Sequence, residues 1–257
     1  MRAAEVIRPA ANRLAEIAWE VKGPADFVSE VDRGAEQALG DVIRERHPQA
    51  VLVAEEGTPG ADRAALTFVA DPLDGTTNFL HGFPWYAVSI GALVDGEIAA
   101  GAVLNVANGE LFTAVRGGGA RRNGQPIAVS RITEPSRALL GTGFPFKDRE
   151  GFAPFLAALP GIMEATAGVR RPGSAALDLC DVACGRFEGF WEFRLAPWDV
   201  AAGLLLVREA GGIVTDLDGN PAPVAHGPIV AGNPAMHAWL LTKLRVQGLR
   251  DQGSGAV

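Results

Sequence analysis

Short apolar runs separated by tight-turn dipeptides are the feature that most constrains the fold of this chain. Between Tyr86 and Val115, three β-rich stretches are divided by Asp95-Gly96 and Asn108-Gly109. Such pairs readily adopt the positive φ angles of two-residue hairpin turns. The segment therefore predicts an antiparallel meander. Glycines 117–119 extend this pattern toward an expected strand at 127–129, and we interpret them as turns because a phosphate-binding loop would precede a helix.

The N-terminal segments combine helical periodicity with short apolar runs. Apolar residues recur at helical spacing over 4–20 and over 31–46, which predicts two amphipathic helices. Between them, the segment Lys22–Asp26 contains Gly and Pro and is expected to form a turn-rich, mobile loop. Apolar runs at 50–54 and 67–70 then predict two buried strands, and each is followed at once by a carboxylate.

The second half of the chain alternates predicted helices with short apolar strands, a pattern typical of α/β architecture. The helices are expected at 151–159, 174–184 and 199–210, and the strands near 187–193, 212–216 and 228–232. We therefore divide the 257 residues into an N-terminal antiparallel half, 1–140, and a C-terminal α/β half, 141–257.

Composition excludes several classes of function. The net charge of −7 disfavours non-specific nucleic-acid binding. No apolar stretch approaches the roughly 20 residues that span a bilayer, and charged residues interrupt the first 20 positions, so we expect a cytoplasmic protein with no membrane partner. Cys180 and Cys184 lie four apart in a predicted helix and are interpreted as core residues, while four scattered histidines do not indicate a zinc site.

The segment Asp71–Phe79 carries the clearest chemical signal. It places Asp71 and Asp74 directly after a strand and before a predicted helix start. Carboxylates in this position can converge on a divalent cation, and the carbonyl of Leu73 can supply a further oxygen. Gly75 permits close approach of the backbone, and amides at a helix start favour a phosphate. An Asp-x-x-Asp pair alone is also typical of solvated turn caps.

Two further acidic sites strengthen the metal hypothesis. Glu55 and Glu56 end one apolar strand, and Asp199 opens a strongly apolar helix. A single acidic residue at a helix start is ordinarily an N-terminal cap. Three acidic sites at the ends of buried elements favour a cation, because uncompensated buried charge is costly.

These motifs, together with 173–179 and 198–203, resemble the inositol monophosphatase family, which shares a superfamily with fructose-1,6-bisphosphatases. The resemblance covers about residues 5–245. It implies an α/β layered sandwich of the sugar-phosphatase type, with layers in the order αβαβα. It also implies two or three Mg²⁺ ions, sensitivity to Li⁺ and a homodimer.

The resemblance also implies a role for particular residues. The metal ligands would be Glu55, Asp71, Asp74, Asp199 and the carbonyl of Leu73. The catalytic residues would be Glu55, Asp71 and Thr76, with Thr76 helping Glu55 to orient the attacking water. Gly75 and Thr76 amides would bind the phosphate. The polyol would contact Asp74, Ala175, Glu192 and Asp199. Lys22, Asp26 and Asp32 match an early element that contributes through a mobile loop.

We therefore expect Mg²⁺-dependent hydrolysis of a small phosphate monoester by activated water, with inositol monophosphate as the leading substrate. Fructose 1,6-bisphosphate, histidinol phosphate and a 3'-phosphoadenosine nucleotide are alternatives on the same scaffold. Arg170 and Arg171 leave a second phosphate contact open, whereas Glu192 favours a neutral polyol. An alternative of another class is a regulatory protein-binding role beside or instead of catalysis.

Overall fold

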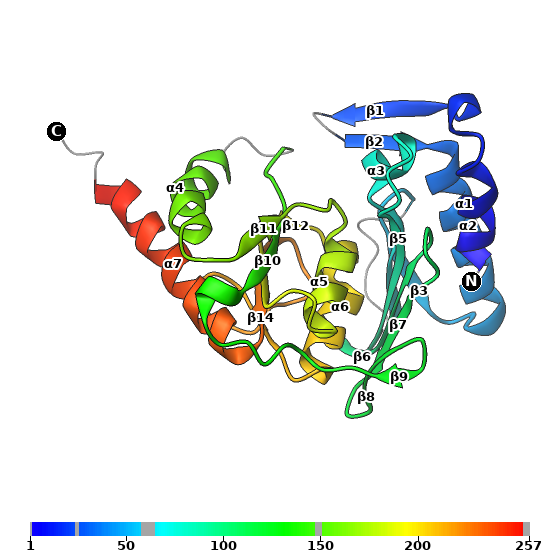
Figure 1. Cartoon of the computed structure of the whole chain (residues 1–257). Coiled ribbons are helices and arrows are strands. Elements are labelled where there is room, and N and C mark those ends of the chain that lie inside the picture. The colour runs from blue at the N-terminus through cyan, green and yellow to red at the C-terminus, as the bar shows by residue number, and fades with distance from the viewer. Residues whose placement is uncertain (1, 24–25, 58–64, 147–150, 254–257) are drawn as a thin grey trace.

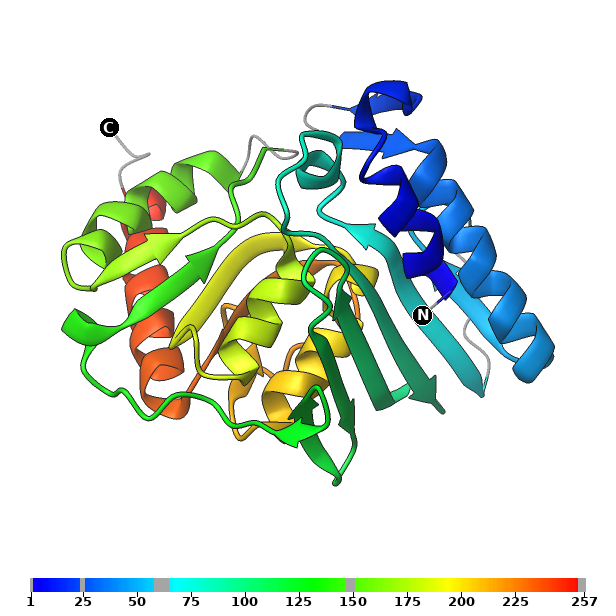
Figure 2. The same ribbon diagram turned by 45° about the vertical axis from the view of Figure 1, so that its right-hand side comes forward.

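The chain folds into five layers in which two sheets alternate with three helical layers (Figure 1). The computed structural model describes residues 2–23, 26–57, 65–146 and 151–253. Figure 2 shows the middle helical layer enclosed between the two sheets. The outer layer on the N-terminal side contains α1 (Arg2–Ala10) and α2 (Glu30–Arg46), the middle layer α5 (Ala175–Ala183) and α6 (Pro197–Glu209), and the other outer layer α4 (Phe152–Met163) and α7 (Pro234–Gly253). This is the α/β layered sandwich expected from the resemblance.

The first sheet has seven strands in sequence order, and only its first pair is parallel. Its strands are β3 (Val51–Ala54), β4 (Leu66–Asp74), β5 (Ala87–Val94), β6 (Glu97–Asn105), β7 (Leu111–Val115), β8 (Gly119–Arg122) and β9 (Gln125–Pro126). The predicted meander is confirmed, with positive φ angles at Asp95 and Gly96 in the first turn.

The second sheet is mixed and has the order β11-β10-β12-β14-β13. Its strands are β10 (Leu139–Thr142), β11 (Gly168–Arg170), β12 (Gly189–Leu195), β13 (Ile213–Thr215) and β14 (Gly227–Gly232). Strand β10 runs parallel to β11 and β12, whereas β14 pairs antiparallel with β12 and β13.

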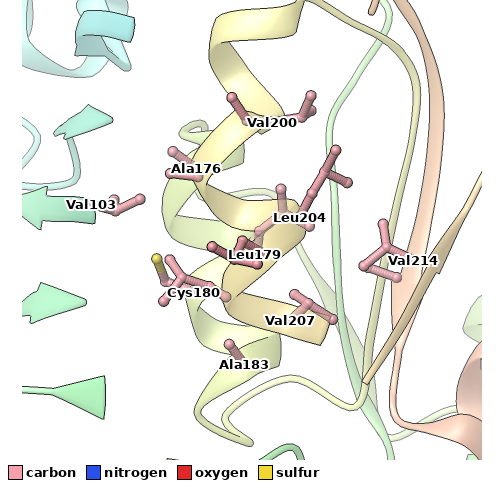
Figure 3. Close-up of a cluster of buried hydrophobic side chains, with 14 of the residues drawn as sticks. Val103, Ala176, Leu179, Cys180, Ala183, Val200, Leu204, Val207 and Val214 are labelled. Atoms are coloured by element: carbon pink, nitrogen blue, oxygen red, sulfur yellow. The ribbon is translucent and has the colours of Figure 1, made fainter. Parts of the chain in front are cut away.

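The core centres on α5 and α6, which are apolar on nearly every face because sheets contact them from both sides (Figure 3). Residues Val200–Val207 of α6 are all buried. Gly203 lets the two helices approach closely, since a Cβ there would lie 2.7 Å from the Cβ of Leu179. Gly91 of β5 is likewise pressed against Ala201. Small residues thus set the spacing of the layers that hold Asp199.

The expected helix over 4–20 is wrong beyond its first half. Helix α1 contains Pro9 and ends at Ala10, and the chain then passes through a 3₁₀ turn into β1 (Trp19–Gly23). Strand β1 pairs antiparallel with β2 (Asp26–Ser29) as a separate two-stranded ribbon. Apolar residues at helical spacing concealed this strand, whose hydrogen bonds come from a partner later in the chain. The expected loop lies at the end of this hairpin; residues 24 and 25 are outside the described residues, so its mobility stays a prediction.

The expected strand at 127–129 is also wrong. Strand β9 stops at Pro126, which has no backbone N–H, and the N–H of Val129 binds the carbonyl of Ala210 on the other half of the molecule. Strands β10 and β11 and helix α7 were not predicted. The proposed division at residue 140 stays a prediction. Among the described helices, none has the length and apolar character that crossing a membrane requires.

Candidate active site

Strand β4 brings Asp71 and Asp74 to one site through an irregularity in its pairing. Residues three apart on a regular strand point to opposite faces. Here Asp71 pairs with Ser89 and Asp74 with Ala87, so β4 contains one more residue than β5 between these pairs. Such a bulge re-aims side chains. It explains how both aspartates contribute to the same cluster, at 2% and 9% exposure.

Two other elements complete the acidic cluster. Strand β3 runs parallel to β4 with Ala54 opposite Ala70, so Glu55 and Asp71 follow side by side. Asp199 lies in the first turn of α6, where its Oδ2 accepts a hydrogen bond of 2.7 Å from the N–H of Ala196. Ligand oxygens of Asp71, Asp74 and Asp199 all lie within 4.8 Å of one another.

The electrostatics of this cluster fit a divalent cation. Burial raises the pKa of Asp71 well above its ordinary value, and the charges of Glu55, Asp74 and Asp199 raise it further. A hydrogen bond of 2.9 Å from the N–H of Leu73 to Asp71 Oδ1 acts in the opposite direction. Several buried carboxylates that destabilise one another's charge form a set of hard oxygen donors, which suits Mg²⁺.

Asp74 is held in place from the other half of the chain. Its Oδ2 accepts hydrogen bonds from Ser174 Oγ at 2.6 Å and from the N–H of Ala176 at 2.8 Å, at the start of α5. Ser174 also caps α5 by accepting from the N–H of Leu177. Sequence reasoning included Ser174 in a motif without giving it a role, although a Ser before an apolar helix is a recognisable cap signal.

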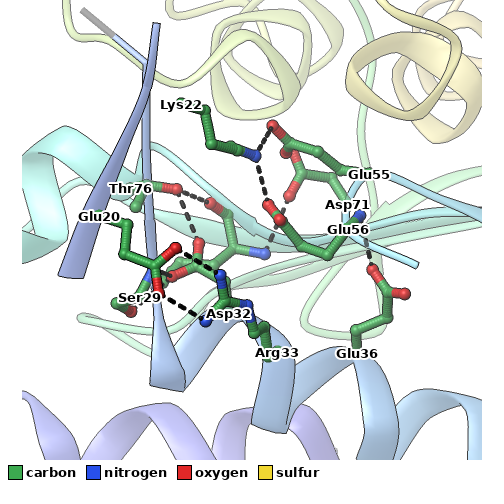
Figure 4. Close-up of polar contacts among 11 residues, drawn as sticks. Glu20, Lys22, Ser29, Asp32, Arg33, Glu36, Glu55, Glu56, Asp71 and Thr76 are labelled. Carbon is green, nitrogen blue, oxygen red and sulfur yellow. Dashed lines mark hydrogen bonds and ion pairs between the residues drawn. The ribbon is translucent and has the colours of Figure 1, made fainter. Parts of the chain in front are cut away.

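The chain turns sharply after Asp74 at Gly75, which has φ 92°. A Cβ here would lie 3.0 Å from the carbonyl oxygen of Trp85, so both conformation and space require glycine. The turn leads into α3 (Thr76–Leu80). Thr76 Oγ1 donates to Asp32 Oδ1 at 2.9 Å and lies 3.0 Å from the carbonyl oxygen of Leu73 (Figure 4). The hydroxyl of Thr76 thus has two acceptors within reach, Asp32 and the Leu73 carbonyl, and the role of Thr76 beside Glu55 stays a prediction.

Lys22, Asp26 and Asp32, which were expected to contribute through a mobile loop, lie on three different elements. Asp32 is on α2 and not in a loop; its Oδ2 accepts from the N–H and Oγ of Ser29. Lys22 is on β1, and its Nζ lies 3.3 Å from Glu55 Oε1 and 2.7 Å from Glu56 Oε1 (Figure 4). Asp26 begins β2 and lines the pocket described next.

The acidic cluster lines one side of a pocket of about 580 Å³, a volume within the range of small-molecule sites. Of the residues expected at the site, the pocket brings together Asp26, Glu55, Asp71, Leu73, Asp74, Gly75, Thr76, Ala175, Glu192 and Asp199. Lys22 and Asp32 are not part of the pocket lining. Lys22 contacts the lining residue Glu55, and Asp32 contacts the lining residue Thr76. Glu192 comes from β12, next to a pairing irregularity, and lies against Gly143.

Several residues in the wall of this pocket received no site role from the sequence: Asp178 and Trp198, which lie in the matching motifs, and Phe144, Phe146 and His226, which lie outside them. Sequence reasoning also treated Arg170 and Arg171 together, whereas the structure separates them. Arg171 lines this pocket, and Arg170 Nη1 instead contacts the carbonyl oxygen of Val169. No local signal distinguishes two adjacent arginines before the tertiary structure is known.

Comparison with known proteins agrees with this geometry. A model of the inositol monophosphatase family matches residues 1–249. Over 218 residues the chain is 48% identical to an inositol-1-monophosphatase of Rhizobium meliloti strain 1021, covering 83% of this chain and 80% of that protein. Over 241 residues it is 45% identical to the putative Nus factor SuhB of Neisseria meningitidis serogroup B, covering 93% and 92%. The crystal structure of native extragenic suppressor protein suhB from Bartonella henselae matches with a TM-score of 0.90 at 41% identity, covering 95% of this chain and 94% of that one. The chain therefore belongs to the inositol monophosphatase family, a family of phosphoric monoester hydrolases.

Proposed function

We propose that the protein catalyses Mg²⁺-dependent hydrolysis of a small phosphate monoester, with inositol monophosphate as the leading substrate. The observation that carries this proposal is the convergence of Asp71, Asp74 and Asp199 within 4.8 Å at a pocket that also contains Ala175 and Glu192. Carboxylates so close together would repel a phosphate dianion unless cations compensate their charge.

The metal-binding residues would be Glu55, Asp71, Asp74, Asp199 and the carbonyl of Leu73, holding two or three ions. When bound, Mg²⁺ supplies neutralisation of the phosphate charge and a lowered pKa for the attacking water. The protein's part is to hold these oxygens in place. Asp74 is fixed by Ser174 and Ala176, and Asp199 by the N–H of Ala196.

Thr76 and Asp32 are suited to orient the water. Thr76 Oγ1 has one proton and two acceptors within reach, Asp32 Oδ1 at 2.9 Å and the Leu73 carbonyl oxygen at 3.0 Å, so with either acceptor its lone pairs remain available to accept from a water molecule. Asp32 is only 2% exposed, so solvent does not compete for its contact with Thr76. In the proposed reaction this water attacks the phosphorus directly, without a covalent enzyme intermediate. The amides of Gly75 and Thr76 would contact the phosphate.

The polyol would lie toward Glu192 and Ala175. A carboxylate such as Glu192 accepts hydrogen bonds from hydroxyl groups, whereas a second phosphate placed directly against it would be repelled. This supports a sugar or polyol and disfavours a phosphate contact at Glu192 itself.

Phosphate release from inositol 1-phosphate, measured across a Mg²⁺ titration and in excess chelator, tests the proposal. The same assay with fructose 1,6-bisphosphate, histidinol phosphate and 3'-phosphoadenosine 5'-phosphate ranks the substrates. We expect no turnover in chelator and inhibition by millimolar Li⁺. An undiminished rate in chelator would refute the metal mechanism, and insensitivity to Li⁺ would contradict only the resemblance to lithium-sensitive members.

A regulatory protein-binding role is a second candidate, and the similarity to a protein named putative Nus factor SuhB is the observation that favours it. An Asp74→Asn variant separates the two. If cells that lack the gene are restored by the folded, inactive variant, the regulatory role is sufficient; if they are not, hydrolysis is required. Homodimerisation stays a prediction that light scattering of the purified chain tests.

A further inference from the structure

The side chain of Asn78 connects segments beside the candidate site that are far apart in the sequence. Its Nδ2 donates to the carbonyl oxygen of Trp85 at 2.7 Å and to that of Pro172 at 2.9 Å, and the carbonyl oxygen of Gly173 lies 3.4 Å away. Trp85 stands just before β5 of the first sheet, whereas Pro172 and Gly173 lie between β11 and α5. A single amide group therefore connects three segments, one of them 94 positions away.

Only a hydrogen-bond donor suits the position of this amide nitrogen. A side-chain –NH₂ group carries two N–H donors, and the three carbonyl oxygens around it can only accept. A carboxylate of the same shape would place oxygen against oxygen. The contacts thus account for an amide at residue 78, close in the sequence to the acids Asp71 and Asp74.

The backbone around Asn78 is closely packed. Gly173 has φ 95°, and a Cβ there would lie 3.1 Å from Asn78 Nδ2. A Cβ at Gly75 would lie 3.0 Å from the carbonyl oxygen of Trp85 and 3.3 Å from that of Gly173. The two glycines allow the turn after β4 and the segment before α5 to approach each other, and the hydrogen bonds of Asn78 hold them together.

The contacts of Asn78 are continuous with those that support Asp74. Ser174 directly follows Gly173, and its Oγ donates to Asp74 Oδ2 at 2.6 Å. The N–H of Ala176 donates to the same oxygen at 2.8 Å. Asn78 itself lies in α3, which begins after the turn that follows Asp74. The segment that holds the Asp74 carboxylate is therefore itself held by Asn78.

We propose that Asn78 is a positioning residue for the metal site: it sets the place of the segment before α5, and through Ser174 it aligns the Asp74 carboxylate for Mg²⁺. The inference rests on the proposed function and adds a residue beyond the candidate ligands. Asn78 does not line the pocket, so its effect is indirect. Groups that orient a metal ligand typically contribute roughly ten- to a hundredfold to metal affinity, because they fix the ligand before the ion binds.

Calorimetric titration of Mg²⁺ into the metal-free, full-length protein measures this effect without requiring hydrolysis. Asn78→Leu keeps a side chain of similar volume, adds no charge and removes both N–H donors. We expect it to weaken Mg²⁺ binding by roughly ten- to a hundredfold. Asn78→Ala should have an effect in the same direction, and it provides the test if the leucine variant does not fold. Unchanged affinity in a folded variant would overturn the proposal.

Asn233→Leu is the matched control. Asn233 makes the same type of contact, since its Nδ2 donates to the carbonyl oxygen of Ile132, 101 positions away, at 2.9 Å. Asn233 is 3% exposed and lies outside the pocket. Its replacement should lower the thermal stability of the metal-free protein and leave the Mg²⁺ dissociation constant unchanged. If the control loses as much affinity as Asn78→Leu, general destabilisation explains both results and the positioning role is refuted.

The connection through Ser174 has a test of its own. Ser174→Ala removes the hydroxyl that donates to Asp74 and should also weaken Mg²⁺ binding. If Asn78 acts through this segment, Asn78→Leu should weaken binding much less in the Ser174→Ala background than in the wild-type protein, because residues that act through one contact are not additive. Losses that multiply as if the two sites were independent would contradict this connection.

Phosphate release from inositol 1-phosphate distinguishes failure of this inference from failure of the proposed function. Because Asn78→Leu keeps every candidate ligand, raising the Mg²⁺ concentration should restore most of its rate, and a rate that Mg²⁺ does not restore would count against a positioning role. If the wild-type protein binds Mg²⁺ but releases no phosphate, the phosphatase proposal fails, and the calorimetric comparison still decides the role of Asn78. A wild-type protein that binds no Mg²⁺ would overturn both.

Discussion

Replacing Asp71 with Asn should change the stability of the metal-free protein and its activity in opposite directions. Asp71 is 2% exposed, and oxygens of Asp74 and Asp199 lie within 4.8 Å of one of its own. The amide side chain keeps the volume and retains an oxygen to accept the N–H of Leu73. The substitution therefore removes charge while leaving the local hydrogen bond and packing in place.

The expected size follows from the geometry. Two unit charges 4.8 Å apart repel by about 3.5 kcal/mol at an effective dielectric constant of about 20. Because burial and the neighbouring acids raise the pKa of Asp71, protonation relieves part of this repulsion. We expect Asp71→Asn to raise the free energy of unfolding in chelator by about 1–3 kcal/mol. With Mg²⁺ at a hundred times its dissociation constant the wild-type protein should gain about 2.7 kcal/mol. The variant should gain much less, and its kcat should fall at least about a thousandfold.

Urea unfolding in chelator and in Mg²⁺, with phosphate release under the same conditions, measures these effects. Asp181→Asn is the matched control, because Asp181 is a buried acid outside the pocket that pairs with Arg186 at 3.0 Å. Its effect on stability should be the same with and without Mg²⁺, and it should retain activity. A folded Asp71→Asn protein that is less stable than wild type in chelator, or equally stabilised by Mg²⁺, would refute the reasoning.

Three further predictions follow from single contacts. Thr76→Ala should lower kcat by about ten- to a thousandfold because the water loses its acceptor, whereas an effect confined to KM would assign Thr76 to binding. Glu192→Gln should lower kcat/KM for inositol 1-phosphate about ten- to a hundredfold more than for an aryl phosphate without hydroxyls, since a charge-assisted acceptor is lost; a common fall for both esters would contradict this. His237 is 5% exposed, lies 2.9 Å from Thr215 Oγ1, and burial lowers its pKa. The unfolded chain therefore takes up a proton more readily, so stability should fall as pH drops below about 6.5, and His237→Gln should reduce that loss in urea titrations at pH 7 and pH 5.

The candidate ligands could be identified from sequence because each one ends or begins a buried element. Glu55 and Asp71 follow apolar strands, and Asp199 opens an apolar helix. Local hydrophobic pattern was sufficient to predict these positions, and resemblance then assigned their roles. The same local logic failed over residues 4–20, where helical spacing concealed β1, because the partner that makes it a strand lies several residues later.

By itself, the sequence determined the meander, the helices α2, α4, α5 and α6, and the set of acidic groups, since turn propensity and hydrophobic periodicity are properties of neighbouring residues. Tertiary structure alone decided how these groups meet. The bulge in β4 turns Asp71 and Asp74 to one side, Ser174 fixes Asp74 across 100 positions of the chain, and Asp32 becomes the partner of Thr76. It also placed Arg171 in the pocket beside two phenylalanines and Arg170 outside it. These contacts depend on strand register and on helix packing, which distant segments set together and no local pattern specifies.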